Sequence, residues 1–303
     1  VENIDQRDFL VINGCDYAQG YFGNRVIADT SHFNLEPLKK ITAGHLKLES
    51  VNFDFIIENG IKATGIASLD LLNGFNTSNG TNIQMTHPEI NQNLNINPAT
   101  GSWASLMASE KILHFDDNNS NAKDFIENLP DSLQLAYNLE INPNGNISAG
   151  TDAFYPQSNL DLKIKMDMPL ALATDSLTYE DTLDFKLNQN FDNSHIYDGS
   201  LILEYENFFP FGGFVNAKVI DVNNNVLTTL SLDQGIEAGI PDGSNVVNIA
   251  TKNTAQLNLS HDQIMLLNSG ERIVLEVIFD TPSYPNTVSI YDHYKLNVKL
   301  KSN

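Results

Sequence analysis

The sequence predicts a mainly β protein, built from tandem antiparallel β-sandwich modules of the immunoglobulin-like kind with one or two short helices each. Apolar and polar residues alternate along most of the 303 residues, as expected for strands with one buried and one solvated face. Short clusters rich in Asn, Gly and Pro separate these segments, which favours antiparallel pairing. The same order of strand, turn, helix and strand also occurs twice along the chain.

The clearest alternation lies in segments 45–51, 132–141 and 160–168. Turns are expected between such segments, notably in NPNGN at 142–146 and DVNNNV at 221–226, because Asn, Asp and Gly tolerate the backbone conformations of tight turns. The glycines of FPFGGF, at 209–214, indicate a bulge or sharp bend between strands. No alternation of strands with long helices is visible, which argues against an α/β fold.

Three segments have helical spacing instead. Segment 119–129 begins with capping residues, places apolar side chains at helical intervals and stops at Pro130. Segment 260–270 has Ser260 as N-cap and ends at Gly270. Segment 102–111, SWASLMASEK, is a third candidate.

Two phrases suggest duplication: LKLESVNFDF from Leu46 and LILEYENFFP from Leu201. We expect them to be equivalent strands of two related modules, because the elements that follow each phrase occur in the same order. The predicted organisation is an N-terminal segment at 1–40, a first β module at 41–168, a strand-rich connector at 169–199 and a second, related β module at 200–303.

The net charge argues against nucleic acid as a partner. The chain carries 38 Asp and Glu against 17 Lys and Arg, a formal net charge of −21. Nucleic acid is therefore an unfavourable partner, since its affinity for proteins depends on Lys and Arg contacts to phosphate.

No apolar stretch is long enough to predict a membrane-spanning helix, and the first residues, VENIDQRDFL, lack the features of an export leader.

The sequence predicts no enzyme. Cys15, the single cysteine, has Asp16 beside it and no basic neighbour, so a buried, inert thiol is expected. The histidines lack metal-site spacing, and nucleophile-elbow and phosphate-loop motifs are absent. A glycosidase-like carboxylate pair would have to come from strand residues such as Glu49, Asp54, Glu204 and Glu206, for which a solvent-facing position is the simpler interpretation. We expect no catalytic residues, cofactor or metal; Ca²⁺ at the acidic clusters that begin at Asp116 and Asp221 is the alternative left open.

Aromatic residues give the remaining functional signal. Exposed Tyr and Phe side chains would form an apolar patch suited to a protein partner, whereas buried ones would fill a sandwich core. The candidate partner-binding residues are Tyr17, Tyr21, Phe22, Phe208, Phe209, Phe211 and Phe214.

Several phrases carry a resemblance, among them ITAGHLKLESVNFDF, FIENLPDSLQLAYNLEINPNGN, MPLALATDSLTYEDTLDF and SIYDHYKLNVKL. In these, the chain resembles Asn-rich, acidic β-sandwich proteins of the Bacteroidota cell envelope, and is similar to plug subunits of the type 9 secretion translocon. The resemblance implies a periplasmic or outer-membrane-associated protein that docks on a channel and seals it. The resemblance implies no catalytic residues, and no lipidated N-terminal cysteine is visible in the sequence.

The sequence therefore predicts a non-enzymatic envelope protein that binds a larger protein partner, with sealing of an outer-membrane protein-secretion channel as the specific form implied by the resemblance. Two alternatives stay open. One is a surface glycan-binding module, in which exposed aromatics stack on sugars. The other is a lipid carrier, because duplicated β modules can enclose an apolar cavity.

Overall fold

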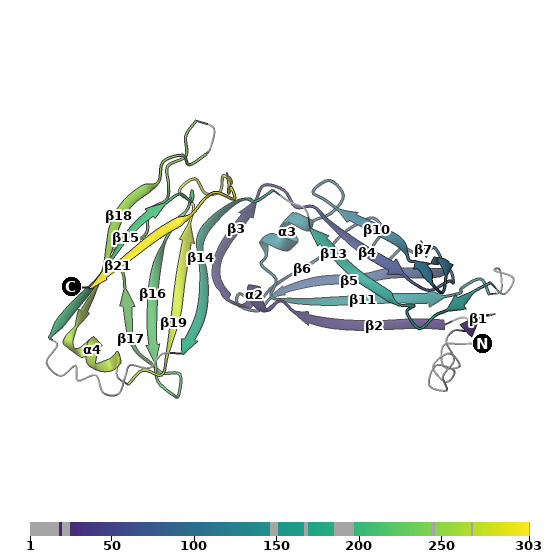
Figure 1. Cartoon of the computed structure of the whole chain (residues 1–303), viewed down its shortest axis with the longest axis horizontal. Coiled ribbons are helices and arrows are strands. Elements are labelled where there is room, and N and C mark those ends of the chain that lie inside the picture. The colour runs from purple at the N-terminus through teal and green to yellow at the C-terminus, as the bar shows by residue number, and fades with distance from the viewer. Residues whose placement is uncertain are drawn as a thin grey trace. The chain divides into compact units, whose positions relative to one another are not determined.

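The protein is mainly β and divides into two compact units. The structure is a computed structural model that describes residues 18–19, 25–145, 151–166, 169–184, 197–243, 246–267 and 269–302. Unit 1 comprises Val1–Leu35, Ser50–Asn76 and Thr81–Met168, and unit 2 comprises Glu36–Glu49, Thr77–Gly80 and Pro169–Asn303. Figure 1 shows the strands of both units.

Unit 1 is a sandwich of two antiparallel sheets. One sheet has the order β10-β4-β13 and the other has the order β2-β11-β5-β6, with β7 pairing to β5. Two short pairs, β1 with β12 and β8 with β9, complete the unit. Its elements are β1 (Ala18–Gln19), β2 (Arg25–Asn34), β4 (Phe53–Asn59), β5 (Gly65–Asn76), β6 (Thr81–Gln84), β7 (Leu94–Ile96), β8 (Thr100–Ser102), β9 (Ser105–Met107), β10 (Ser109–Phe115), α3 (Ala122–Glu127), β11 (Ser132–Ile141), β12 (Ala153–Phe154) and β13 (Leu160–Met166).

Unit 2 is a second sandwich. Its smaller sheet has the order β18-β15-β21, and its larger sheet has the order β17-β16-β19-β14-β20, with β3 pairing to β14. Its elements are α2 (Glu36–Lys39), β3 (Ile41–Leu48), β14 (Ala171–Asp184), β15 (Asp198–Asn207), β16 (Gly212–Ile220), β17 (Val226–Ser231), β18 (Thr251–Ser260), α4 (His261–Leu267), β19 (Arg272–Asp280), β20 (Val288–Ser289) and β21 (Leu296–Ser302).

The two units repeat one topology. The sheet β10-β4-β13 corresponds strand for strand to β18-β15-β21, and β2-β11-β5-β6 corresponds to β14-β19-β16-β17. The short pair of β1 with β12 corresponds to the pairing of the first residues of β14 with β20. A short helix precedes the equivalent strands β11 and β19 in both units.

A buried asparagine fixes the register of this repeat. Asn59 ends β4, and its side-chain Nδ2 donates to the carbonyls of Ala63 (3.2 Å) and Asn97 (2.8 Å), while its Oδ1 accepts from the N–H of Ile61 (2.9 Å). Asn207 ends β15 and makes the same three bonds, to the carbonyls of Phe211 and Glu237 and from the N–H of Phe209, each at 2.9 Å. These asparagines are therefore equivalent.

This equivalence corrects the alignment expected from the sequence. The phrase that begins at Leu46 covers the end of β3 and the start of β4, whereas the phrase that begins at Leu201 lies mostly within β15. The strand equivalent to β15 is β4 alone. Alternating strands resemble one another at many shifts, so the phrases alone could not determine the register.

The units also differ from the expected domain boundaries. Segment 1–40 includes β2, a strand of the larger sheet of unit 1. Strand β3 pairs with β14 from Leu48↔Leu172 to Ile41↔Tyr179 and so belongs to unit 2. The expected connector at 169–199 includes β14, which pairs with β19, β20 and β3 in the larger sheet of unit 2. These placements depend on long-range pairing, which alternation within a segment does not reveal.

Two of the three expected helices are confirmed as α3 and α4, and β11 has the bounds that the alternation predicted. The third helix, at 102–111, is wrong, because this segment forms the hairpin of β8 with β9 and the start of β10. Strand β10 pairs with β4 and buries Leu113 and Phe115 completely. Within 102–111 most side chains are exposed, so strand pairing in the hairpin and with β4 overrides the helix propensity of Ala, Leu, Met, Glu and Lys.

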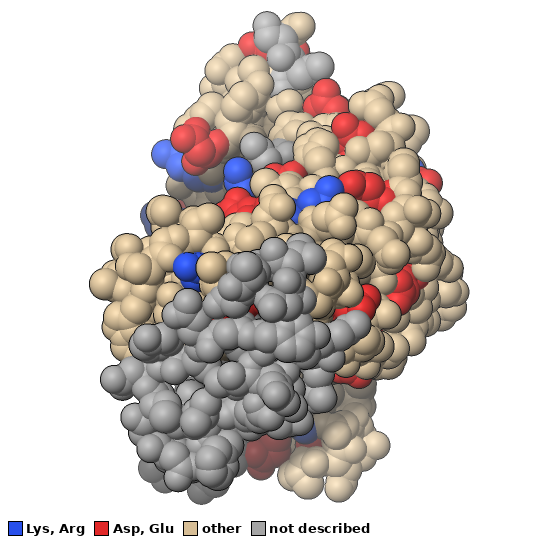
Figure 2. All heavy atoms as spheres, turned by 90° about the vertical axis from the view of Figure 1, so that its right-hand side faces the viewer, with Lys and Arg blue, Asp and Glu red and all other residues tan. Residues whose placement is uncertain are grey.

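The surface is acidic but only sparsely charged. On the face shown in Figure 2, Asp, Glu, Lys and Arg side chains are dispersed among uncharged residues. Within the described part of the chain, no helix is long and apolar enough to cross a membrane.

The asparagine interactions generate a stability prediction. Replacing Asn59 with Ala leaves the Ile61 N–H and two carbonyls without these partners, so N59A should lower the free energy of unfolding of unit 1 by about 2–4 kcal/mol. The control is N95A, because Asn95 is exposed on β7 and removes an amide of the same kind. Denaturant unfolding measures both; equal losses in the two variants would contradict the anchoring role of Asn59.

Candidate functional site

The candidate site is an apolar hollow between the two sheets of unit 2. One cavity of about 460 Å³ is bounded by the loop after β15 and by inward residues of β16, β19 and β21. Its lining comprises Asn207, Phe209, Phe211, Gly212, Gly213, Val215, Ile236, Leu275, Val277, Phe279 and Leu296. Its size falls within the range of pockets that bind small molecules.

A second apolar cavity of about 300 Å³ adjoins the first. The two cavities share Val215 and Ile236 in their walls. The second is lined by Leu203, Val215, Ala217, Leu230, Leu232, Ile236, Leu257 and Val298, which come from both sheets. The hollow therefore extends along the interior of the sandwich.

The asparagine at the end of β15 holds one wall of this hollow in place. Its bonds to Phe209 and Phe211 hold the loop, where the two phenyl rings stack with their centroids 5.1 Å apart. The Phe211 ring also meets the edge of Phe279, at 5.8 Å between centroids. The chain then turns into β16 at a pair of glycines.

Close packing of the backbone requires both glycines. A Cβ at Gly212 would lie 2.3 Å from the carbonyl oxygen of Ile236, and one at Gly213 would lie 2.0 Å from that of Ile278. Any larger residue would push β16 away from segment 236–238 or from β19. The FPFGGF segment is thus the turn by which the chain leaves one sheet and enters the other.

Smaller side chains on β15 and β18 leave space for the second cavity of unit 2, whereas Tyr205, Phe209 and Phe211 are larger than their equivalents Ile57, Ile61 and Ala63 in unit 1. In unit 1, Phe53 and Phe115 stack at 4.7 Å, and together with Phe55 and Leu113 they are buried to 5% exposure or less. With Asn59 aligned to Asn207, the equivalent residues of unit 2 follow from the strand pairings and are all smaller: Leu201, Leu257, Leu203 and Ala255.

Strand β21 leaves this interior accessible from one side. Leu296 and Val298 line the two cavities, yet they are 41% and 51% exposed. They pair with Asn207 and Tyr205, which are almost completely buried. Burial also raises the pKa of the Tyr205 hydroxyl, which accepts from the N–H of Glu237 at 3.0 Å. The hollow is therefore accessible to solvent at β21, whereas the buried residues of β15 close it on their side.

The structure brings together only some of the predicted partner-binding residues. Phe209 and Phe211 line the hollow. Phe208 is half-buried with the Lys295 ammonium 5.7 Å from its ring centroid, and Phe214 is 49% exposed. The three remaining candidates, Tyr17, Tyr21 and Phe22, lie outside the described residues, as does Cys15.

The inward residues of β16 and β19 were missed as site residues. Their signal was present in the long apolar run of ERIVLEVIFD, at 271–280. That run predicts a strand but does not show which residues face a cavity.

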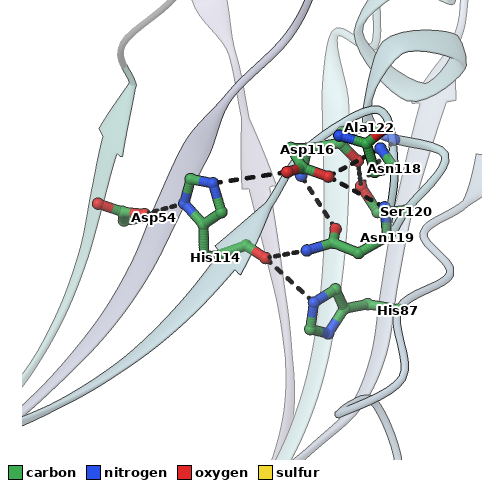
Figure 3. Close-up of polar contacts among 8 residues, drawn as sticks. All are labelled: Asp54, His87, His114, Asp116, Asn118, Asn119, Ser120 and Ala122. Carbon is green, nitrogen blue, oxygen red and sulfur yellow. Dashed lines mark hydrogen bonds and ion pairs between the residues drawn. The ribbon is translucent and has the colours of Figure 1, made fainter.

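The acidic cluster at Asp116 forms a polar network in unit 1 (Figure 3). His114 lies between two carboxylates: its Nδ1 is 2.7 Å from Asp54 Oδ1 and its Nε2 is 3.8 Å from Asp116 Oδ2. Asp116 Oδ1 accepts the N–H groups of Asn118 (2.7 Å) and Asn119 (3.0 Å). The Asn118 N–H is the main reason that the pKa of Asp116 is lowered.

The imidazole of His87 contacts the same strand, β10. The N–H of Glu89 donates to His87 Nδ1 at 3.1 Å, so the His87 proton resides on Nε2, which lies 3.1 Å from the carbonyl oxygen of His114. The His87 ring also packs on Phe115, at 4.4 Å between centroids. These contacts support the end of β10.

Both acidic clusters considered for Ca²⁺ use carboxylate oxygens as turn caps. Asp221 Oδ1 accepts from the N–H groups of Asn223 and Asn225 at 2.8 Å, and its Oδ2 accepts from the Asn225 amide at 3.0 Å. A bound cation would compete with these donors. Among the described residues, no three His, Cys, Asp or Glu side chains form a group that could hold a metal ion.

Comparisons with known proteins assign no family. No protein-family model and no curated protein matches the chain. Among solved structures, it is similar to "a putative secreted protein" from Parabacteroides distasonis ATCC 8503, with 12% identity, covering 95% of this chain and 83% of that one, at a TM-score of 0.35. A similarity this low supports no conclusion about fold or function.

The Asp116 turn generates a pH prediction. Because its pKa is lower in the folded chain than the ordinary value of about 4, Asp116 stabilises the fold above that value and loses this effect as the pH falls through the folded pKa. The variant D116N should therefore have a lower Tm than the wild type at pH 7, and the difference should shrink as the pH falls below the ordinary carboxyl pKa and through the lower folded pKa.

The matched control is D117N, which removes the same charge from an exposed neighbouring residue. Thermal unfolding between pH 2 and pH 7 measures both variants. An effect of D116N that is independent of pH, or equal to that of D117N, would show that the carboxylate does not stabilise the turn.

Proposed function

We propose that this protein is a non-enzymatic binding protein of the cell envelope, whose unit 2 takes up apolar side chains of a larger protein partner. The observation that carries the proposal is the hollow between the sheets of unit 2, which is accessible at β21, where the inward Leu296 and Val298 are 41% and 51% exposed. Burying such surface stabilises a complex by about 25 cal/mol per Å² before the costs of association are subtracted.

Comparison of the two units supports this proposal. Unit 1 has the same strand order but fills its interior with Phe53, Phe55 and Phe115. The shared strand order can therefore enclose a packed core. The hollow of unit 2 results from the side chains of unit 2 and not from the strand order. Phe209 and Phe211 offer rigid aromatic surface in the wall of the hollow, which suits recognition of apolar groups.

The more specific form of this function is docking on an outer-membrane protein-secretion channel as its plug. Sequence resemblance to type 9 secretion plug subunits supports this form, and so does an architecture that offers binding surfaces. The periplasm or the periplasmic side of the outer membrane is the corresponding location.

Lipid carriage is the second candidate function. It is favoured by the size and apolar lining of the hollow, which would accept an acyl chain as readily as amino-acid side chains. Glycan binding stays a prediction from the sequence.

The proposal is tested by filling the hollow. The variant L203F/L275F places a phenyl ring in each cavity, where unit 1 has Phe55 and Tyr137 at the equivalent positions. The control I202F/V274F places phenyl rings at adjacent residues on the opposite strand faces. Both variants and the wild type are affinity-purified from native envelopes, and the co-eluting proteins are quantified by mass spectrometry.

We expect one protein to co-elute in stoichiometric amount with the wild type and the control, and to be depleted at least tenfold with L203F/L275F. Equal recovery with all three forms, or no protein partner at all, would overturn the proposal. A lipid detected by native mass spectrometry in the wild type but absent from the filled variant would favour lipid carriage instead.

A further inference from the structure

Strand β21 has two distinct faces. Its inward face carries Leu296 and Val298, which line the hollow, and its outward face carries Asn297, Lys299 and Lys301. The strand pairs with β15 on one side, and no other described strand pairs with it. An edge of this kind presents backbone N–H and C=O groups that a further strand can use.

A strand added at this edge would reach the hollow. Side chains alternate between the two faces of a sheet, so every second side chain of the added strand would lie beside Leu296 and Val298 and face the cavities. Apolar side chains at those positions would enter the interior that Phe209, Leu275 and Val277 line. The other side chains would lie on the outer face of the sheet.

Lysines predominate on that outer face. Lys252, Lys295, Lys299 and Lys301 lie on or beside the outer strands β18 and β21, and the acidic residues on the same face of β15 are Glu204, Glu206 and, at the start of the strand, Asp198. Lys301 pairs with Glu204 and Lys252 pairs with Glu206. This excess of positive charge is local, in a chain with a net charge of −21. Since charges interact over only about 8 Å at physiological ionic strength, a strand beside β21 would respond mainly to these lysines.

The lysines also favour some added strands over others at the edge of β21. Like charges placed directly opposite one another across a strand pair are destabilising, so a second copy of β21 is disfavoured at this edge. Acidic side chains opposite Lys299 and Lys301 would be favourable. The edge thus selects a strand that alternates apolar and acidic residues.

Unit 1 supplies an internal comparison. Its last strand, β13, has the same pattern, with exposed Leu162 and Ile164 facing inward and Lys163 and Lys165 in the places of Lys299 and Lys301. Yet the interior beside β13 contains Phe53, Phe55 and Ile57 at 5% exposure or less. Among the described residues, the edge at β21 lies beside the two cavities of unit 2, whereas the residues beside β13 are large and buried.

We propose that unit 2 is completed by an extended segment of the partner protein, which pairs with the free edge of β21, inserts apolar side chains into the hollow and places acidic side chains against Lys299 and Lys301. This inference rests on the proposed function and specifies the chemistry of the partner segment. Main-chain pairing would provide affinity, and the alternate side chains would provide specificity.

The test uses two fluorescein-labelled peptides, TVEVEVEVT and TVKVKVKVT, and fluorescence anisotropy. The full chain should bind the acidic peptide at least roughly tenfold more tightly than the basic one, since two favourable cross-strand charge pairs are replaced by repulsive ones. The variant K299E/K301E should reverse this preference. The matched variant K163E/K165E, which makes the same change on β13, should leave it unchanged.

Two further measurements test where the acidic peptide binds and whether its binding depends on the hollow. On binding the acidic peptide, amide hydrogen exchange should slow in β21 and remain unchanged in β13, and L203F/L275F should weaken binding at least tenfold. Equal affinity for both peptides, no effect of K299E/K301E, or protection outside β21 would overturn the inference. If native partner capture is lost with L203F/L275F but unaffected by K299E/K301E, the proposed function stands and strand addition fails.

Discussion

Each sandwich depends on a buried asparagine amide at the point where the chain leaves one sheet and enters the other. Asn59 and Asn207 each satisfy two carbonyls and one N–H that the crossing would otherwise leave without these partners. Buried backbone groups without partners are costly, so the same solution occurs in both units. By fixing the crossing, this amide sets the register in which the two sheets face each other.

Once the register is set, side-chain volume decides what each interior can do. Phe53, Phe55 and Phe115 close the interior of unit 1, and full burial of each aromatic ring contributes about 1.5–3 kcal/mol. Unit 2 has Leu at all three positions and keeps an apolar hollow in an otherwise matching frame. One copy of the fold therefore has large buried aromatic residues at these positions, and the other keeps an apolar hollow. The proposed function follows from this asymmetry.

Much of the fold could be predicted from local patterns. Alternation predicted a mainly β sandwich and the bounds of β11, and capping residues predicted α3 and α4. The pairing of β3 with β14 could not be predicted, because it joins segments far apart in the sequence. The alignment of the repeat was wrong because period-two strands look alike until a fixed point such as Asn207 is recognised. The site was predicted only at Phe209 and Phe211, since a hollow depends on volumes summed over residues from both sheets.

The most direct test of the account is a crystal structure of the protein determined under xenon pressure, because xenon occupies apolar cavities. The account predicts xenon in unit 2, in contact with Val215 and Ile236, where the two cavities meet. It predicts none in the core of unit 1 between Phe53 and Phe115, whose stacked rings fill that space. Xenon absent from unit 2, or bound equally in both cores, would contradict the claim that unit 2 is the hollow copy of a shared fold.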